Sequence, residues 1–214
     1  MHVVITGANR GIGAELAALY SARGAQVTGT SRSGGDLPRL DVTQPDSHAA
    51  LGRKLDGRPV DLLVCNAGVY PDKGESLADG YPPEMWADGF AVNVTGVFLT
   101  VQSLLPNLQG AKMPKIAIIS SQMASHARAP GGSYIYRASK AAALNLGRNL
   151  ATDLKDLEIA VGIYHPGWVR TDMGGDAADI PVETAAQGLA ARFDALTIDS
   201  TGCFLTWDGH EHPY

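Results

Sequence analysis

Tyr136 and Lys140 stand four residues apart inside a stretch whose pattern predicts a helix over residues 133–154. Side chains four apart on a helix share a face, one turn apart. A phenol works as a general acid or base only when its pKa falls from about 10 toward the working pH. An ammonium about 4 Å away supplies roughly 4 kcal/mol at an effective dielectric of 20, or about three pKa units. The spacing therefore predicts proton-transfer chemistry.

Two serines close the apolar run that precedes this helix. Residues 115–120 are expected to form a strand, and Ser120 and Ser121 stand at its carboxyl end. A hydroxyl at that end of a parallel strand lies on the side of the sheet where ligands bind, so it could hold a substrate carbonyl oxygen. Serines also form turns, and without Tyr136 and Lys140 a turn is the simpler interpretation.

A glycine-rich segment begins almost at the first residue. Residues 6–13 read TGANRGIG, after the apolar run Val3–Ile5 and before a helical pattern over residues 11–23. Backbone N–H groups at a helix N-terminus form a site for a pyrophosphate, and glycines let the backbone approach it closely. An ordinary strand-to-helix turn explains the same residues, so the motif decides nothing alone.

The end of the second expected strand bears on the kind of dinucleotide. Residues 26–30 form that strand, and Ser31 and Arg32 follow it with no acidic residue at the tip. An acid there binds the adenine ribose of NAD, whereas a cation accommodates the 2′-phosphate of NADP. Arg32, with Ser31 as an extra donor, therefore favours NADP(H), with NAD(H) as the alternative. Asp41 could accept a hydrogen bond from the adenine amino group or simply cap a turn.

Apolar runs alternate with helical patterns along the whole chain. Strands are expected at residues 3–6, 26–30, 38–40, 60–65, 115–120, 159–165 and 203–207, and helices at 11–23, 46–55, 83–90, 92–107, 133–154 and 182–196. This order predicts an α/β fold, a single-domain Rossmann-type doubly wound parallel sheet of about seven strands. Residues 31–37 are too few for a crossover helix. The helix after strand two is therefore expected to be missing, and the third strand to be short and near an edge.

Composition narrows the class of protein further. The 214 residues are 45% hydrophobic and 18% charged, which fits one soluble domain over residues 1–214. A net charge of −5 with scattered basic residues argues against nucleic acid, and no apolar run approaches the roughly 20 residues of a membrane span. The first residues already read as a core strand, which favours a cytoplasmic protein without a signal peptide. His210 and His212 lack the company that a metal needs, so no metal site is expected.

Together these segments resemble the short-chain dehydrogenase/reductase family over nearly the whole chain. The resemblance rests on TGxxxGxG at 6–13, Asp41-Val42, Asn66-Ala67-Gly68, Asn93, Ser121, YxxxK at 136–140 and PGxxxT at 166–171, all in family order. Residues 131–140 are similar to the carbonyl-reductase-like, C-factor-like branch. The segment 171–181, where family members carry a substrate lid, is short, which implies an open site and argues against a large, tightly wrapped substrate.

The resemblance implies a role for each of four catalytic residues. Tyr136 would be the general acid in reduction and the base in oxidation, and Lys140 would lower the phenol pKa and hold the nicotinamide ribose. Ser121 would bind and polarise the substrate oxygen, with Ser120 as the alternative. Asn93 would help to hold a water chain to Lys140, or else be a structural residue that kinks its helix.

The resemblance also implies where ligands bind. Contacts to the dinucleotide are expected from Gly7, Asn9, Arg10, Gly11, Ile12, Gly13, Ser31, Arg32, Asp41, Val42, Asn66, Ala67, Gly68, Tyr136, Lys140, Pro166, Gly167, Val169 and Thr171. The substrate is expected to face Gln122, Met123, His126, Tyr134, Trp168 and Met173, with Tyr70 and Trp86 on the other side; for each of these, core packing or loop exposure is an equal alternative.

The predicted function is NADP(H)-dependent reduction of a small aldehyde or ketone, or the reverse oxidation of an alcohol. A non-catalytic NADP(H)-binding signalling protein is the alternative, and the presence of all four catalytic residues argues against it. Family members often dimerise through the equivalents of residues 92–107 and 133–154, so a homodimer is a further expectation.

Overall fold

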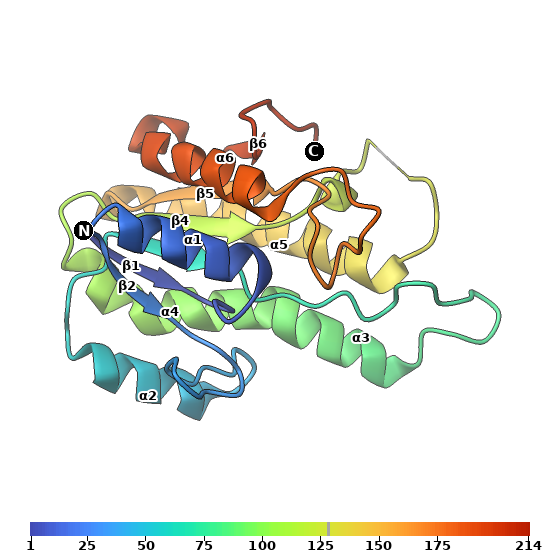
Figure 1. Ribbon diagram of the computed structural model, residues 1–214, viewed down its shortest axis with the longest axis horizontal. Coiled ribbons are helices and arrows are strands. Elements are labelled where there is room, and N and C mark those ends of the chain that lie inside the picture. Colours follow the sequence, from blue (N-terminus) through green and yellow to red (C-terminus); the bar gives the residue numbers. More distant parts are fainter. Residues whose placement is uncertain (128) are drawn as a thin grey trace.

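Six parallel strands form one sheet in the computed structural model, which describes residues 1–127 and 129–214. Their order across the sheet is β2-β1-β3-β4-β5-β6, so the chain leaves β1 first to one side and then to the other (Figure 1). This confirms the doubly wound parallel α/β fold. The strands are β1 (His2–Ile5), β2 (Gln26–Gly29), β3 (Leu62–Cys65), β4 (Lys115–Ile119), β5 (Ala160–His165) and β6 (Phe204–Thr206).

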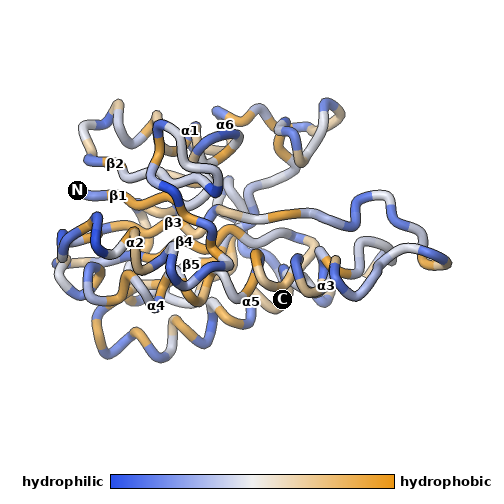
Figure 2. The backbone as a smooth tube through the Cα atoms, turned by 90° about the horizontal axis from the view of Figure 1, so that it is seen from below, coloured by the Kyte–Doolittle hydropathy of each residue, from blue (hydrophilic) through white to orange (hydrophobic). Residues whose placement is uncertain are grey.

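Helices cover both faces of the sheet. Helices α1 (Gly11–Ala22) and α6 (Val182–Ala195) lie together on one face, and α2 (Pro45–Leu55), α4 (Gly96–Gln109) and α5 (Tyr134–Asp153) lie on the other. Successive side chains of β1 lie on opposite faces of the sheet. Val3 packs in the core under α1 and α6, and Val4 packs in the core under α2 and α4. Figure 2 shows the apolar strands gathered between the helices.

The seventh strand is a correction to the sequence prediction. Residues 38–40 form only one bridge, between Ser31 and Arg39, with Ser31 N donating to Pro38 O and Leu40 N to Ser31 O. One paired residue is too short to count as a strand. Residues 31–37 form turns and bends without a helix, as expected, so the first helix after β2 is α2, which begins at Pro45.

One long helical run replaces the two separate helices expected at residues 83–90 and 92–107. Helix α3 (Pro83–Phe90) passes through a π-helical turn (Ala91–Thr95) into α4 without a break. The run Pro83–Gln109 is long and apolar enough by composition to span a membrane, which the sequence analysis did not anticipate. Its apolarity has a packing explanation, because Val101 and Leu104 are buried in the core of the sheet.

Two irregular segments extend the carboxyl edge of the sheet. The loop 69–82, which follows β3, reaches out beside α3, and the loop 166–181 follows β5 (Figures 1 and 2). Ligands of open α/β sheets bind outside the carboxyl ends of the strands, at the point where the strand order reverses. Here that point lies between β1 and β3.

Candidate active site

The four residues expected to be catalytic come from three different parts of the fold and are all buried. Ser121 follows β4 at the start of a short 3-10 turn (Gln122–Ala124), Tyr136 and Lys140 lie on α5, and Asn93 lies in the π-helical turn. Their exposed fractions are between 1% and 8%. The carboxyl edge of the sheet therefore holds a polar cluster shielded from bulk water.

Tyr136 lies between Ser121 and Lys140. A hydrogen bond joins the Tyr136 phenol to Ser121, and Lys140 Nζ lies 5.7 Å from the centroid of the phenol ring. Lys140 Nζ donates to Ile119 O at 3.0 Å, which anchors the lysine to the end of β4. The Ser120 hydroxyl is used elsewhere, because it donates to the backbone oxygen of Lys140. This geometry favours Ser121 over Ser120 as the serine that faces a substrate.

Burial sets the pKa values of this pair. It raises the pKa of Tyr136 to about 12, although the hydrogen bond to Ser121 acts in the opposite direction. Burial also lowers the pKa of Lys140 to about 8, because the enclosed ammonium loses the stabilisation that water gives to a charge. The expected lowering of the Tyr136 pKa by Lys140 is therefore wrong for this structure. At neutral pH the phenol holds its proton, which suits an acid better than a base.

Asn93 uses its amide to tie the loop 69–82 to α5. Its Oδ1 accepts from Val69 N and its Nδ2 donates to Val69 O, both at 2.9 Å, and Nδ2 also donates to Ser139 Oγ at 3.0 Å. A Cβ on Gly68 would lie 3.2 Å from Asn93 Oδ1 and 3.3 Å from Lys140 Nζ. A Cβ at position 68 would be tightly placed between these two side chains, which favours glycine there.

The glycine-rich turn is shaped by close contacts with the end of β3. Gly7 and Gly11 have φ values of +66° and +54°, and a Cβ on Gly13 would lie 2.3 Å from Gly7 O. Asn66 Nδ2 donates to Thr6 O and Gly7 O at 3.0 Å each. Helix α1 starts at Gly11 without a side-chain cap, so its first N–H groups are available to an anion. The residues present fit a pyrophosphate.

The region expected to bind adenine is open and basic. Arg32 is exposed, whereas Ser31 is buried and its hydroxyl donates to Gly34 O. Asp41 caps a turn, because its Oδ1 accepts from both the N–H and the hydroxyl of Thr43, and this lowers its pKa. Arg32 and Arg39 act on Asp41 in the same direction, so both cations lie near it. Arg39 was not among the residues expected to bind the dinucleotide, although it lies in the expected third strand.

The loop 166–181 meets the glycine turn from the other side. A Cβ on Gly11 would lie 3.3 Å from Thr171 Cγ2, and Arg10 pairs with Asp172 at 2.6 Å. Val169 is buried and forms a bridge with Ile180. Thr171 therefore lies alongside the glycine turn, and contacts of Thr171 and Val169 with the dinucleotide remain a prediction.

The expected substrate residues are less tightly gathered. Gln122 and Met123 lie in the 3-10 turn beside Ser121, and His126 is exposed. Trp168 and Met173 are 48% and 38% exposed, and Trp168 Nε1 donates to Gly174 O. These last two side chains lie on the outside of a short loop rather than in an enclosed pocket.

Two residues near Tyr136 have roles that the sequence did not indicate. Tyr70, which was expected to face the substrate, stacks on the Tyr136 ring with centroids 4.2 Å apart. Asp72 is buried, and its carboxylate accepts hydrogen bonds from the first turn of α5. No local pattern could have found Asp72, because it lies more than 60 residues from its partners.

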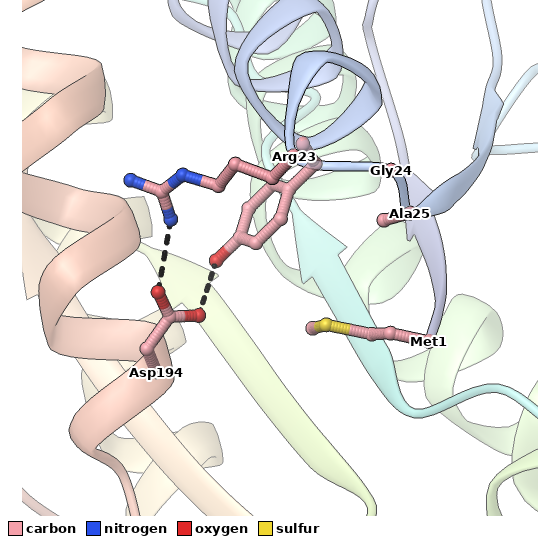
Figure 3. Close-up of a pocket in the computed structure, with 6 residues that line it drawn as sticks. Met1, Arg23, Gly24, Ala25 and Asp194 are labelled. Atoms are coloured by element: carbon pink, nitrogen blue, oxygen red, sulfur yellow. Dashed lines mark hydrogen bonds and ion pairs between the residues drawn. The ribbon is translucent and has the colours of Figure 1, made fainter.

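A separate hollow lies at the opposite edge of the sheet. It measures about 270 Å³ and is lined by Met1, Tyr20, Arg23, Gly24, Ala25 and Asp194 (Figure 3). Arg23 and Tyr20 both bond to Asp194, at 2.9 Å and 3.1 Å, so these polar groups satisfy one another. Met1 and Ala25 precede the first residues of β1 and β2, which separates this hollow from the carboxyl edge.

Fold and site together define a doubly wound α/β protein with a Ser–Tyr–Lys set at the carboxyl edge of its sheet. Comparison with known proteins identifies the class, since the short chain dehydrogenase family matches residues 1–180. The chain belongs to the short-chain dehydrogenase family of oxidoreductases.

Individual relatives cover most or all of the chain. It is 36% identical to C-signal of Myxococcus xanthus, over 73% of this chain and 93% of that protein. It is 32% identical to 1-hydroxy-2-glutathionyl-2-methyl-3-butene dehydrogenase of Rhodococcus sp. (strain AD45), over 97% and 96% of the two chains. Among solved structures, NADPH-bound carbonyl reductase from chicken fatty liver matches with a TM-score of 0.88 and 26% identity, over 100% and 98% of the two chains.

Proposed function

We propose that this chain is an NADPH-dependent reductase of small aldehydes or ketones. The observation that carries the proposal is the meeting of Ser121, Tyr136 and Lys140 at the carboxyl edge of the sheet, beside the glycine turn. A hydroxyl donor, a phenol and an ammonium that lie close together support this proposal, since Ser121 bonds to the Tyr136 phenol and Lys140 Nζ lies 5.7 Å from the centre of its ring. That is the set of groups needed to hold and protonate an oxygen atom.

Each residue has a distinct task in this proposal. The Ser121 hydroxyl and the Tyr136 phenol both donate to the substrate carbonyl oxygen, which polarises the carbonyl group. Tyr136 then transfers its proton to that oxygen, and the raised pKa keeps the phenol protonated beforehand. Lys140, fixed to Ile119 O, stabilises the negative charge that develops on the phenol. NADPH, when bound, supplies the hydride.

The proposed preference for NADPH rests on the basic region beside β2. Arg32 and Arg39 are exposed near the expected adenine site, and Asp41 is already held by Thr43. Arginine forks are well suited to bind phosphate. The likeness to an NADPH-bound carbonyl reductase supports the same assignment.

Small substrates are favoured by the openness of the site. A parallel bridge between Val169 and Ile180 brings the two ends of the loop 166–181 together, and Lys73 Nζ donates to Met173 O at the surface. Few residues are left to enclose a ligand. A homodimer through α4 and α5 remains a prediction, supported by the exposed Phe98 on α4.

A non-catalytic, NADP(H)-binding signalling role is the second candidate. The relative that favours it is C-signal, with 36% identity. The intact set of Asn93, Ser121, Tyr136 and Lys140 favours the enzyme, because a binding module has no need of a buried phenol and ammonium.

The test follows NADPH absorbance with a panel of small aldehydes, ketones and quinones. At least one should be reduced, and Tyr136→Phe should lower kcat by about 10²- to 10⁴-fold, because it removes only the acidic hydroxyl. NADPH binding, followed by fluorescence, should change little. Tyr214→Phe is the matched control, since this exposed tyrosine bonds to Gly202 O, outside the expected site, and should leave kcat unchanged.

Two outcomes count against the enzyme. Tight NADPH binding with no turnover of any carbonyl compound would favour the signalling role. Full activity in Tyr136→Phe would remove the proposed acid.

A further inference from the structure

Asp72 is a carboxylate that the structure buries completely, with 0% of its surface exposed. It lies in the loop 69–82, outside every motif that the sequence analysis singled out. Burying a carboxylate is costly unless its oxygens are hydrogen-bonded. Its partners therefore indicate what the residue does.

Those partners are the N–H groups of the second and third residues of α5, in its first turn. Asp72 Oδ2 accepts from Ile135 N at 2.7 Å, and Oδ1 accepts from Tyr136 N at 3.2 Å. The first N–H groups of a helix have no partner within the helix, and the positive end of the helix dipole favours a negative charge there. Asp72 thus caps the helix that carries Tyr136 and Lys140.

The local cap that α5 would ordinarily use is absent. Ser133 precedes the helix with φ at 49° and makes no side-chain cap. Its hydroxyl bonds instead to the Tyr70 hydroxyl. Serine is a good helix cap in extended backbone, but here its side chain serves the same loop that supplies Asp72.

Two residues close to Asp72 in the loop 69–82, Tyr70 and Val69, contact Tyr136 and Asn93 respectively. Tyr70 stacks on the Tyr136 ring at 4.2 Å with an angle of 18° between the planes. Val69 is held at both its N–H and its C=O by Asn93. The 69–72 segment is therefore fixed at one end by the π-helical turn, and it touches Tyr136 through both the ring and the backbone.

We infer that Asp72 is a positioning residue for Tyr136, acting through the first turn of α5; the inference rests on the proposed function. Tyr136 is the third residue of the helix, in the turn that frays when a cap is lost. Lys140 lies one turn further along and is anchored separately to Ile119 O. Loss of the cap should therefore displace the phenol relative to Lys140 and Ser121, rather than move all three together.

The test compares Asp72→Ala and Asp72→Asn with a matched control. Asn107→Ala also removes a buried side chain that bonds to a backbone oxygen, that of Arg58, but at the far end of α4. Asp72→Ala should lower kcat by about 10- to 100-fold with KM for NADPH nearly unchanged, because a small misplacement of the acid is enough. Asp72→Asn keeps one acceptor oxygen and should recover part of the loss. Asn107→Ala should keep full kcat at a similar fall in melting temperature.

Two further readouts separate positioning from general destabilisation. The solvent isotope effect on kcat should rise in Asp72→Ala, because proton transfer becomes more rate-limiting. Amide hydrogen exchange at Ile135 and Tyr136 should quicken, while exchange in the later turns of α5 stays slow. Unchanged kcat in Asp72→Ala, or a loss of kcat matched by Asn107→Ala, would overturn the inference.

The inference can also be judged if the wild-type protein reduces no carbonyl compound and the proposed function fails. NMR signals of the Tyr136 ring then report its position directly, through the stacking on Tyr70. They should shift in Asp72→Ala and stay in place in Asn107→Ala. Ring signals that do not move in Asp72→Ala would show that the carboxylate does not position the phenol.

Discussion

The catalytic corner and the adenine side of this protein are built in different ways. Around Tyr136, side chains bond across long stretches of chain, as Asn93 does to Ser139 and Lys140 does to Ile119. In the segment 31–44, the described side-chain hydrogen bonds span at most six residues, as from the Ser31 hydroxyl to Gly34 O and from the Thr43 hydroxyl to Asp41 Oδ1. One region is fixed by tertiary structure and the other by local turns.

This difference suggests a division of labour. Proton transfer needs groups held in place before the substrate arrives, which long-range bonds between packed elements provide. Recognition of a terminal phosphate needs charge at an accessible surface, which a turn with exposed arginines provides. Substitutions in the first region should alter both rate and stability, whereas those in the second should alter cofactor choice alone.

The glycine turn lies between the two regions. Gly13→Ala tests whether the turn is held by tertiary contacts, like the catalytic corner, or by local bonds, like the adenine side. The added Cβ would lie 2.3 Å from Gly7 O and 2.5 Å from Asn66 Nδ2. Neither atom can move away easily, because one belongs to the backbone and the other is hydrogen-bonded to Thr6 O and Gly7 O. We expect a loss of about 3 kcal/mol in unfolding free energy and NADPH binding weakened by roughly 100-fold (about 2.7 kcal/mol). Urea unfolding and fluorescence titration measure the two effects.

Gly52→Ala provides the control for this substitution. Gly52 lies inside α2 with no atom within 4 Å of an added Cβ. It should gain up to about 1 kcal/mol from the higher helix propensity of alanine. If Gly13→Ala behaved like Gly52→Ala, the turn would belong to the loosely built region.

A second prediction concerns the charge inside the catalytic corner. Burial lowers the pKa of Lys140 from 10.5 to about 8, so the folded protein releases this proton at lower pH than the unfolded chain does. Between about pH 8 and 10 the unfolded chain therefore holds more protons, and stability should rise with pH. The gain should be about 2 kcal/mol, and it should be absent in Lys140→Met.

The measurement is urea unfolding of both proteins from pH 6 to 10. The difference between them isolates Lys140 from buried tyrosines such as Tyr20, whose raised pKa lowers stability above about pH 10 in both. If the difference in unfolding free energy between the two proteins stayed constant from pH 6 to 10, the pKa of Lys140 would not be lowered in the folded protein.

The same contrast explains what the sequence could and could not reveal. The Tyr136–Lys140 pair, the glycine turn and the absence of a helix from residues 31–37 are local patterns, and they could be predicted from the sequence. The Asp72 cap depends on a contact between residues 63 apart, and the direction of the Tyr136 pKa depends on how deeply its ring is enclosed. Residues 38–40 were wrongly predicted to be a strand, because a short apolar run does not show how many of its residues will pair with a neighbouring strand.

The smallest effect is expected from Arg32→Asp, which probes the open region. Replacing an exposed cation should reduce the preference for NADPH over NADH by about 10-fold or more, since a charged hydrogen bond contributes roughly 1.5–3 kcal/mol. Stability should hardly change, because Arg32 makes no long-range contact among the described bonds of its segment. Arg58→Asp, with the same charge change on another exposed arginine, should leave the preference unaltered. If the ratio of kcat/KM for NADPH to that for NADH were the same in Arg32→Asp and wild type, the phosphate would be assigned to another residue, and Arg39 and Arg10 are the exposed cations nearest to hand for that role.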